Sequence, residues 1–137
     1  MTSPGSVSVR GLLLALAVGS AGCSNRYDDI EVCVMYPTDV QAAIEACTRL
    51  IDKPRLVDPD RYGWFVARGN HKLKANDVRG ALADFDASID LRPDDPELYG
   101  MRADAHRRLG DSAAAARDLR RAAELERQAA SAPTAKP

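Results

Sequence analysis

The segment Tyr62–Asp95 (YGWFVARGNHKLKANDVRGALADFDASIDLRPDD) aligns with the residues from Pro96 onward when it is shifted by 34 places. Small residues then fall on small ones and bulky residues on bulky ones, as a repeated packing unit requires. Identical residues stand at five aligned positions, which are Arg68 and Arg102, Asp77 and Asp111, Ala81 and Ala115, Asp84 and Asp118, and Leu91 and Leu125. A period of 34 residues is typical of stacked helix–turn–helix units. The sequence therefore predicts an all-α solenoid.

The first 22 residues have the pattern of a signal peptide. Arg10 supplies a positive charge, the apolar run Gly11–Val18 (GLLLALAV) follows, and Gly19–Gly22 are small residues typical of a cleavage site. As a helix, this run would reach about 12 Å, which is less than the ~30 Å of a bilayer core. We therefore expect residues 1–22 to be removed on export rather than to span a membrane.

Cys23 follows the signal-like segment directly. The residues from Ser20 to Cys23 (SAGC) resemble the bacterial lipobox, whose cysteine receives diacylglycerol and becomes the new N-terminus. Ser20 departs from that motif, which usually has an aliphatic residue there, and a plain signal-peptidase cut among the same small residues is the alternative. The resemblance predicts a lipid anchor on Cys23 and a protein on the periplasmic side of a bacterial membrane. The alternative cut predicts a soluble periplasmic or secreted protein.

The exported part divides into a tether, a helical domain and a tail. Residues 23–32 are polar without a sustained period and are predicted to be the tether, and residues 128–137 are predicted to be a disordered tail. Between them, the domain 33–127 is predicted to hold a half repeat at 33–57 and full repeats at 58–93 and 94–127.

The half repeat is predicted to contain one amphipathic helix, because apolar residues recur there at spacings of three and four. Thr38 and Gln41 form a capping-box pattern at its start. The equivalent start in the next unit is predicted at Asp58, as N-cap, with Pro59 in the first turn. In the helix that starts at Asp58, Gly69 predicts the close approach of a neighbouring helix. The first helix of the half repeat is missing from the pattern or too short to form.

Cys33 and Cys47 are predicted to form a structural disulfide. With Cys23 acylated, these two are an even pair in a chain of three cysteines. The bond would hold the chain across the apolar stripe that the absent helix leaves open, and closing a loop of about 15 residues stabilises a fold by roughly 3 kcal/mol. A metal pair and a redox pair are the alternatives, but the spacing suits neither a C-x-x-C motif nor a zinc site.

The repeated residues resemble the tetratricopeptide repeat. Arg68-Gly69-Asn70 and Arg102-Ala103-Asp104 match the family's first helix, and Asp77 through Pro93 match its second helix and exit. The resemblance implies a right-handed solenoid of about two and a half units.

The resemblance also implies a concave peptide groove along the first helix of each unit. The residues that it places in this groove are Val66, Asn70 and Lys74 from one repeat and Asp104, Arg107 and Arg108 from the next. Asn70 matches an asparagine that holds a peptide carboxylate in chaperone-binding members. Val66 stands where those members have a lysine, so a complete carboxylate clamp is not expected.

Composition and motifs predict a binding protein rather than an enzyme. The net charge is -1 and aromatic residues are 5%, which does not favour nucleic-acid binding. The sequence contains no Gly-rich phosphate loop, no H-E-x-x-H, and no nucleophile with a recognisable base, so we expect no catalysis, cofactor or metal. We predict a monomeric scaffold that binds a peptide segment of another envelope or periplasmic protein. A homo-oligomer that stacks its end helices is the alternative.

Overall fold

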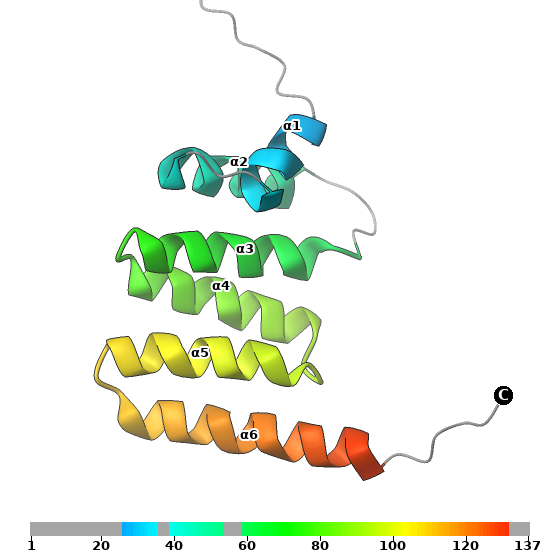
Figure 1. The fold of residues 1–137 in the computed structure, drawn as a ribbon, viewed down its shortest axis with the longest axis vertical. Helices are drawn as coiled ribbons and strands as arrows, with labels where there is room; N and C mark the ends of the chain where they lie inside the picture. The colour runs from blue at the N-terminus through cyan, green and yellow to red at the C-terminus, as the bar shows by residue number, and fades with distance from the viewer. Residues whose placement is uncertain (1–25, 36–38, 54–58, 132–137) are drawn as a thin grey trace, which may run out of the picture.

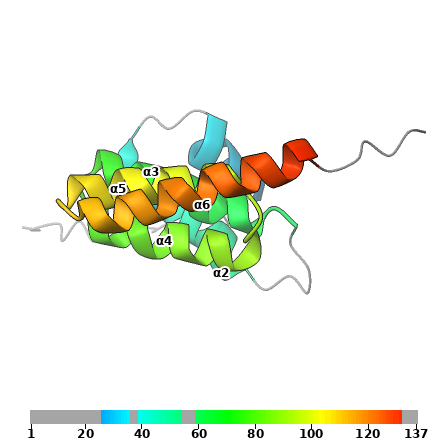
Figure 2. The same cartoon turned by 90° about the horizontal axis from the view of Figure 1, so that it is seen from below.

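The computed structural model describes residues 26–35, 39–53 and 59–131, and all of its regular secondary structure is helical. The elements are α1 (Arg26–Ile30), the π-helical turn η1 (Glu31–Met35), α2 (Val40–Asp52), α3 (Arg61–Lys74), α4 (Val78–Leu91), α5 (Pro96–Arg108) and α6 (Ser112–Ser131). Each helix packs on the next in the chain, so that they form one stack (Figure 1). Figure 2 shows α1, α3 and α5 on one side of this stack and α2 and α4 on the other. The predicted all-α class is confirmed.

The turns inside the two full units follow the 34-residue period. Asn76 has φ 63° and Gly110 has φ 80°, the left-handed conformation that asparagine and glycine adopt most readily. The residue after each turn is an aspartate that caps the next helix. The Oδ1 atoms of Asp77 and Asp111 accept hydrogen bonds from the third amide beyond them, at 2.9 and 2.8 Å. One turn geometry is therefore used twice.

Two of the repeated identities pair with each other inside each unit. Arg68 Nη2 lies 2.7 Å from Asp84 Oδ1, and Arg102 Nη2 lies 2.7 Å from Asp118 Oδ1. Both aspartates are buried. The hydrogen bond to Asp118 raises the pKa of the Arg102 guanidinium, an effect that burial partly offsets. We call each pair a clasp, because it joins the two helices of one unit.

Each clasp arginine also reaches back to the preceding unit. Arg68 Nη1 donates to the Thr48 hydroxyl on α2 at 3.0 Å, and Arg102 Nη1 donates to the Asp86 carboxylate on α4 at 2.6 Å. One side chain thus connects three helices, which fixes how successive units stack.

The close approach predicted at Gly69 is confirmed. A Cβ atom at this position would lie 2.7 Å from Cε1 of Phe85, which is fully buried in α4. In the last unit the equivalent residues are Ala103 and Leu119, and Leu119 is 44% exposed. The smaller side chain on the second helix leaves room for the extra methyl group on the first.

The prediction of a tether over residues 23–32 is wrong for residues 26–32, which are helical. Asp29 of α1 is buried and accepts hydrogen bonds from Arg49 Nε and Lys53 Nζ of α2, both at 2.8 Å. This segment is too short to show a helical period, and it is held by these tertiary contacts. It supplies a short first helix to the unit that was predicted to lack one.

The two predicted helix starts differ from the structure. The N-cap of α2 is Asp39, whose side chain accepts from the amide of Gln41, and Asp60 precedes α3. Thr38 and Asp58 lie outside the described residues. Aspartate serves as well as threonine in this role, so the start of α2 moves by one residue to Asp39. At α3 the Asp60 side chain makes no capping hydrogen bond.

The prediction of disorder from residue 128 is also wrong at its beginning, because α6 continues to Ser131. The residues there are good helix formers, and Gln128 Nε2 donates to Glu124 Oε1 at 3.3 Å. Residues 132–137, the predicted signal peptide 1–22 and Cys23 lie outside the described residues. Among the helices that the structure describes, none is long and apolar enough to cross a membrane.

Candidate functional site

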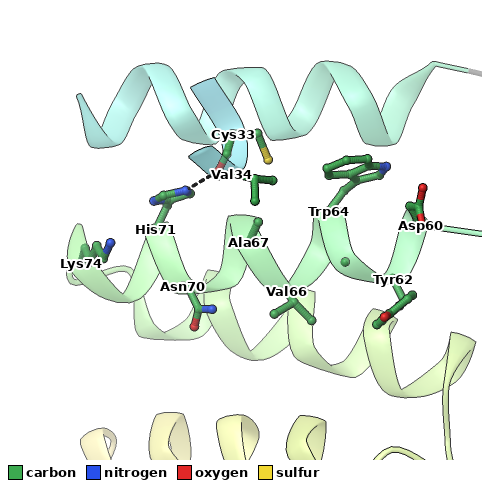
Figure 3. A pocket seen from close by; sticks show the side chains of 11 residues that line it. Cys33, Val34, Asp60, Tyr62, Trp64, Val66, Ala67, Asn70, His71 and Lys74 are labelled. Carbon is green, nitrogen blue, oxygen red and sulfur yellow. Dashed lines mark hydrogen bonds between the residues drawn. The ribbon is translucent and has the colours of Figure 1, made fainter. Parts of the chain in front are cut away.

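A groove of about 510 Å³ opens between η1 and α3 (Figure 3). Its lining residues are Cys33 and Val34 of η1, Asp60 before α3, and Tyr62, Gly63, Trp64, Val66, Ala67, Asn70, His71 and Lys74 of α3. The floor is mostly apolar, and the charged residues Asp60 and Lys74 stand at opposite ends. Most small-molecule and peptide sites are concave and apolar with a few polar groups of this kind.

A disulfide positions the η1 wall of the groove. Cys33 and Cys47 form the predicted bond, with their Cα atoms 5.0 Å apart and both residues fully buried. His71 of α3 adds a second link, because its Nε2 lies 2.8 Å from the carbonyl oxygen of Cys33. A carbonyl only accepts, so Nε2 donates here. The wall is therefore fixed both to α2 and to α3.

The exposed residue on that wall is Val34. It is 53% exposed although it is a large apolar side chain, and it faces the groove from η1 (Figure 3). Its neighbour Met35 is 61% exposed but does not line the groove. Exposed apolar side chains beside a concave surface are typical of interaction sites.

Three of the six predicted groove residues lie together in this groove. Val66, Asn70 and Lys74 follow one another at intervals of four on α3, which places them along one face of the helix. Val66 and Asn70 are half-buried, and Lys74 is exposed. Val66 and Asn70 lie along the edge of the groove away from Val34 (Figure 3), where Val66 also packs against the cluster that contains Ile89.

The other three predicted groove residues lie on α5 and do not line this groove. Arg107 forms an ion pair with Asp104, one turn away on the same exposed surface. Arg108 Nη1 lies 3.4 Å from the carbonyl oxygen of Leu73, at the end of α3. The groove at η1 therefore contains only the α3 members of the predicted set.

Sequence reasoning missed the part of Trp64 and His71 in the site. Neither Trp64 nor His71 was among the predicted groove residues, and both are buried. The Nε1 atom of Trp64 and the Nδ1 atom of His71 have no hydrogen-bond partner among the described residues. Their spacing of seven residues, which places two side chains on one helix face, was the available signal. An unpartnered buried polar atom costs about 1–3 kcal/mol, and both atoms are buried beneath the surface of the groove.

Across the described residues, no group of three His, Cys, Asp or Glu side chains is placed to hold a metal ion. His106, the second histidine, lies on α5 with Nε2 3.8 Å from Asp118 and is remote from His71 in the sequence.

Comparisons with known proteins agree with the helical-repeat architecture. No family model matches the chain. It is 29% identical over 82 residues to the heat shock protein sti1 homolog of Schizosaccharomyces pombe. The aligned residues make up 60% of this chain but only 14% of that protein. Among solved structures it is similar to MamA MSR-1 C2, with a TM-score of 0.68 and 15% identity, over 77% of this chain and 60% of that one. The chain therefore has a tetratricopeptide-like helical-repeat fold.

Proposed function

We propose that this protein is a non-catalytic adaptor of the bacterial envelope, which binds a segment of another envelope protein in the groove between η1 and α3. The observation that carries the proposal is the groove itself, with exposed Val34 on one wall and Val66, Asn70 and Lys74 on the other. A partner segment would place an apolar side chain between these walls.

The polar groups of the groove suggest how such a segment is oriented. Trp64 Nε1 is a donor and requires an acceptor, whereas His71 Nδ1 accepts when the imidazole is neutral, because Nε2 carries the proton. A peptide backbone offers both an acceptor and a donor in every residue. Small shifts of the lining side chains would let the bound segment meet these two atoms.

The location rests on the N-terminal sequence and on the disulfide. The signal-like residues 1–22 and the lipobox-like Cys23 support export and a lipid anchor. Disulfides persist in oxidising compartments such as the periplasm, which agrees with the Cys33–Cys47 bond. An anchored adaptor would gain from a high local concentration of partners at the membrane, so micromolar affinity at the groove would suffice.

The test compares two substitutions on neighbouring residues of η1. The full chain is expressed in a bacterial envelope with a C-terminal tag, and partners are recovered after detergent solubilisation and quantified by mass spectrometry. Val34→Glu places a charge in the groove, and we expect it to reduce recovery of the specific partner about tenfold, since burying an unpaired charge is costly. Met35→Glu makes the same charge change outside the groove and should leave recovery unchanged. Equal recovery with both variants would rule out the groove as the binding site.

A further inference from the structure

The outer face of α6 is the end of the stack opposite the groove (Figure 1). Inside the stack the same face of α2 is covered by α3, and that of α4 by α5. Aligned by the repeat, the residues at three positions on this face are Ile44, Thr48 and Ile51 in α2, Leu82, Asp86 and Ile89 in α4, and Ala116, Arg120 and Ala123 in α6. The same three positions can therefore be compared with and without a helix on top.

In α2 and α4, where a helix covers this face, the two outer positions hold apolar residues and the central position holds a hydrogen-bond acceptor. In α4, Ile89 shares a buried cluster with Leu98 and Tyr99 of α5, and Asp86 accepts from Arg102. In α2, Ile51 is buried in a cluster with the first helix of the next unit, and Thr48 accepts from the clasp arginine of that unit. The covering helix thus always brings an arginine to the central position.

In α6 both features differ. Alanine replaces the two bulky residues, and a hollow of about 540 Å³ lies on the surface, lined by Arg117, Arg120, Arg121, Ala123, Glu124 and Arg127. The central acceptor is replaced by Arg120. A further helix of the kind found in this chain would bring an arginine against Arg120, so the end of the stack rejects a copy of its own repeat.

Three of the four arginines that line this hollow form no ion pair among the residues that the structure describes. Arg121 pairs with Glu124 at 3.0 Å, but no carboxylate in the described part of the chain forms an ion pair with Arg117, Arg120 or Arg127. These three follow one another at spacings of three and seven, so they share one stripe about 15 Å long. The two clasp arginines inside the stack, in contrast, are each paired with a carboxylate.

We propose that the outer face of α6 binds an α-helix of a partner protein that presents a carboxylate to Arg120 and bulky apolar side chains to Ala116 and Ala123. This helix would take the place of the first helix of a further unit. Inside the stack the covering helix brings the arginine and α4 the carboxylate, whereas here the partner would bring the carboxylate and α6 the arginine. Alanines let a partner backbone approach closely, and guanidinium groups bind carboxylates through two hydrogen bonds. A polyanion is the less suitable occupant, because Glu124 and Glu126 interrupt the cations along the helix. The site is separate from the groove and does not depend on its function.

The test uses a helix-stabilised peptide that copies residues 94–110 of this chain with Arg102→Glu. The peptide keeps the apolar side of α5 and carries a carboxylate at the clasp position, and the native-sequence peptide is its control. Binding of each labelled peptide to the full, oxidised chain is measured by fluorescence anisotropy at low and at physiological salt. We expect the Glu peptide to bind about tenfold more tightly than the native peptide, because one pair is attractive and the other repulsive.

Charge reversal on the protein makes the test specific to this face. Arg120→Glu should invert the order, so that the native peptide binds more tightly, while Arg79→Glu, an equal change at an exposed residue of α4, should leave the order as it is. Circular dichroism checks that both variants are folded. Failure of the Glu peptide to bind, equal binding of the two peptides, or equal effects of the two variants would overturn the proposal. Tighter competition by a single-stranded oligonucleotide or by anionic lipid vesicles than by the Glu peptide would also overturn it, in favour of a polyanion surface.

Discussion

The N-terminal unit and the two units that follow it solve the same packing problem with different chemistry. In the full units, an arginine on the first helix and a buried aspartate on the second form the clasp. In the N-terminal unit the position equivalent to Asp84 is Ala46, so no such clasp can form. There the disulfide between η1 and α2 and the Asp29 ion pairs hold the short first helix instead.

The difference shows why the groove lies where it does. α1 and η1 together span ten residues, whereas α3 spans 14. A full-length first helix would continue along α3, but η1 ends at Met35 and leaves Trp64 and Val34 lining an open surface. The irregular unit therefore forms one wall of the groove, and the first helix of the next regular unit forms the rest of its lining.

Removing the disulfide should produce the largest loss of stability and should affect the N-terminal unit first. We expect Cys33→Ala with Cys47→Ala to lower the free energy of unfolding by about 3 kcal/mol, because a loop of about 15 residues is no longer closed in the unfolded state. Trp64 is the single tryptophan and belongs to the same buried cluster as the two cysteines. Its fluorescence therefore reports this unit, while circular dichroism reports all the helices.

In urea the Trp64 transition should move to lower concentration and separate from the circular dichroism transition. Helical-repeat arrays lose cooperativity in this way when one terminal unit is weakened. If both signals keep the wild-type midpoint, the covalent bond is not what holds the N-terminal unit together.

The two clasps should differ in strength although their residues are identical. The Asp84 side chain is 3% exposed and also pairs with Lys72, whereas the Asp118 side chain is 9% exposed. Asp84→Asn should cost about 2 kcal/mol, since it leaves two cations in a largely buried place. Asp118→Asn should cost about 1 kcal/mol, because Arg102 keeps its ion pair with Asp86.

Urea unfolding followed by circular dichroism measures both costs under one set of conditions. Asp86→Asn, which removes only the exposed partner of Arg102, serves as the control and should change stability by a few tenths of a kcal/mol. A larger loss from Asp118→Asn than from Asp84→Asn would show that burial does not set the strength of the clasp.

The regular part of the fold could be predicted from sequence because each unit is determined by local signals that recur. Asn76 and Gly110 mark the turns, the aspartates after them start the second helices, and the period aligns the units. The identical arginines and aspartates were visible in the same alignment. Their pairing was not inferred, although the interval of 16 residues from arginine to aspartate is the same in both units.

The N-terminal unit could not be predicted in the same way, because its structure depends on contacts distant in sequence. α1 and η1 are too short for a hydrophobic period to appear, and Asp29 looks like a tether residue until Arg49 and Lys53 are placed beside it. The resemblance to a regular array placed the predicted groove residues on α3 and α5 alike. It gave no indication of the groove between η1 and α3, because that groove depends on the position of η1, which Cys33 and His71 set.

A further prediction tests whether the two full units are interchangeable at their closest contact. Gly69→Ala should cost about 1 kcal/mol, because overpacking against Phe85 at 2.7 Å outweighs the gain of about 1 kcal/mol in helix propensity. In the Phe85→Leu background, which copies the Ala103 and Leu119 pair of the last unit, the same Gly69→Ala change should instead stabilise the protein, since the methyl group then has room. A double-mutant cycle followed by urea unfolding measures this reversal of sign directly. Equal costs in the two backgrounds would mean that the backbone of α3, rather than the Phe85 ring, requires glycine at this position.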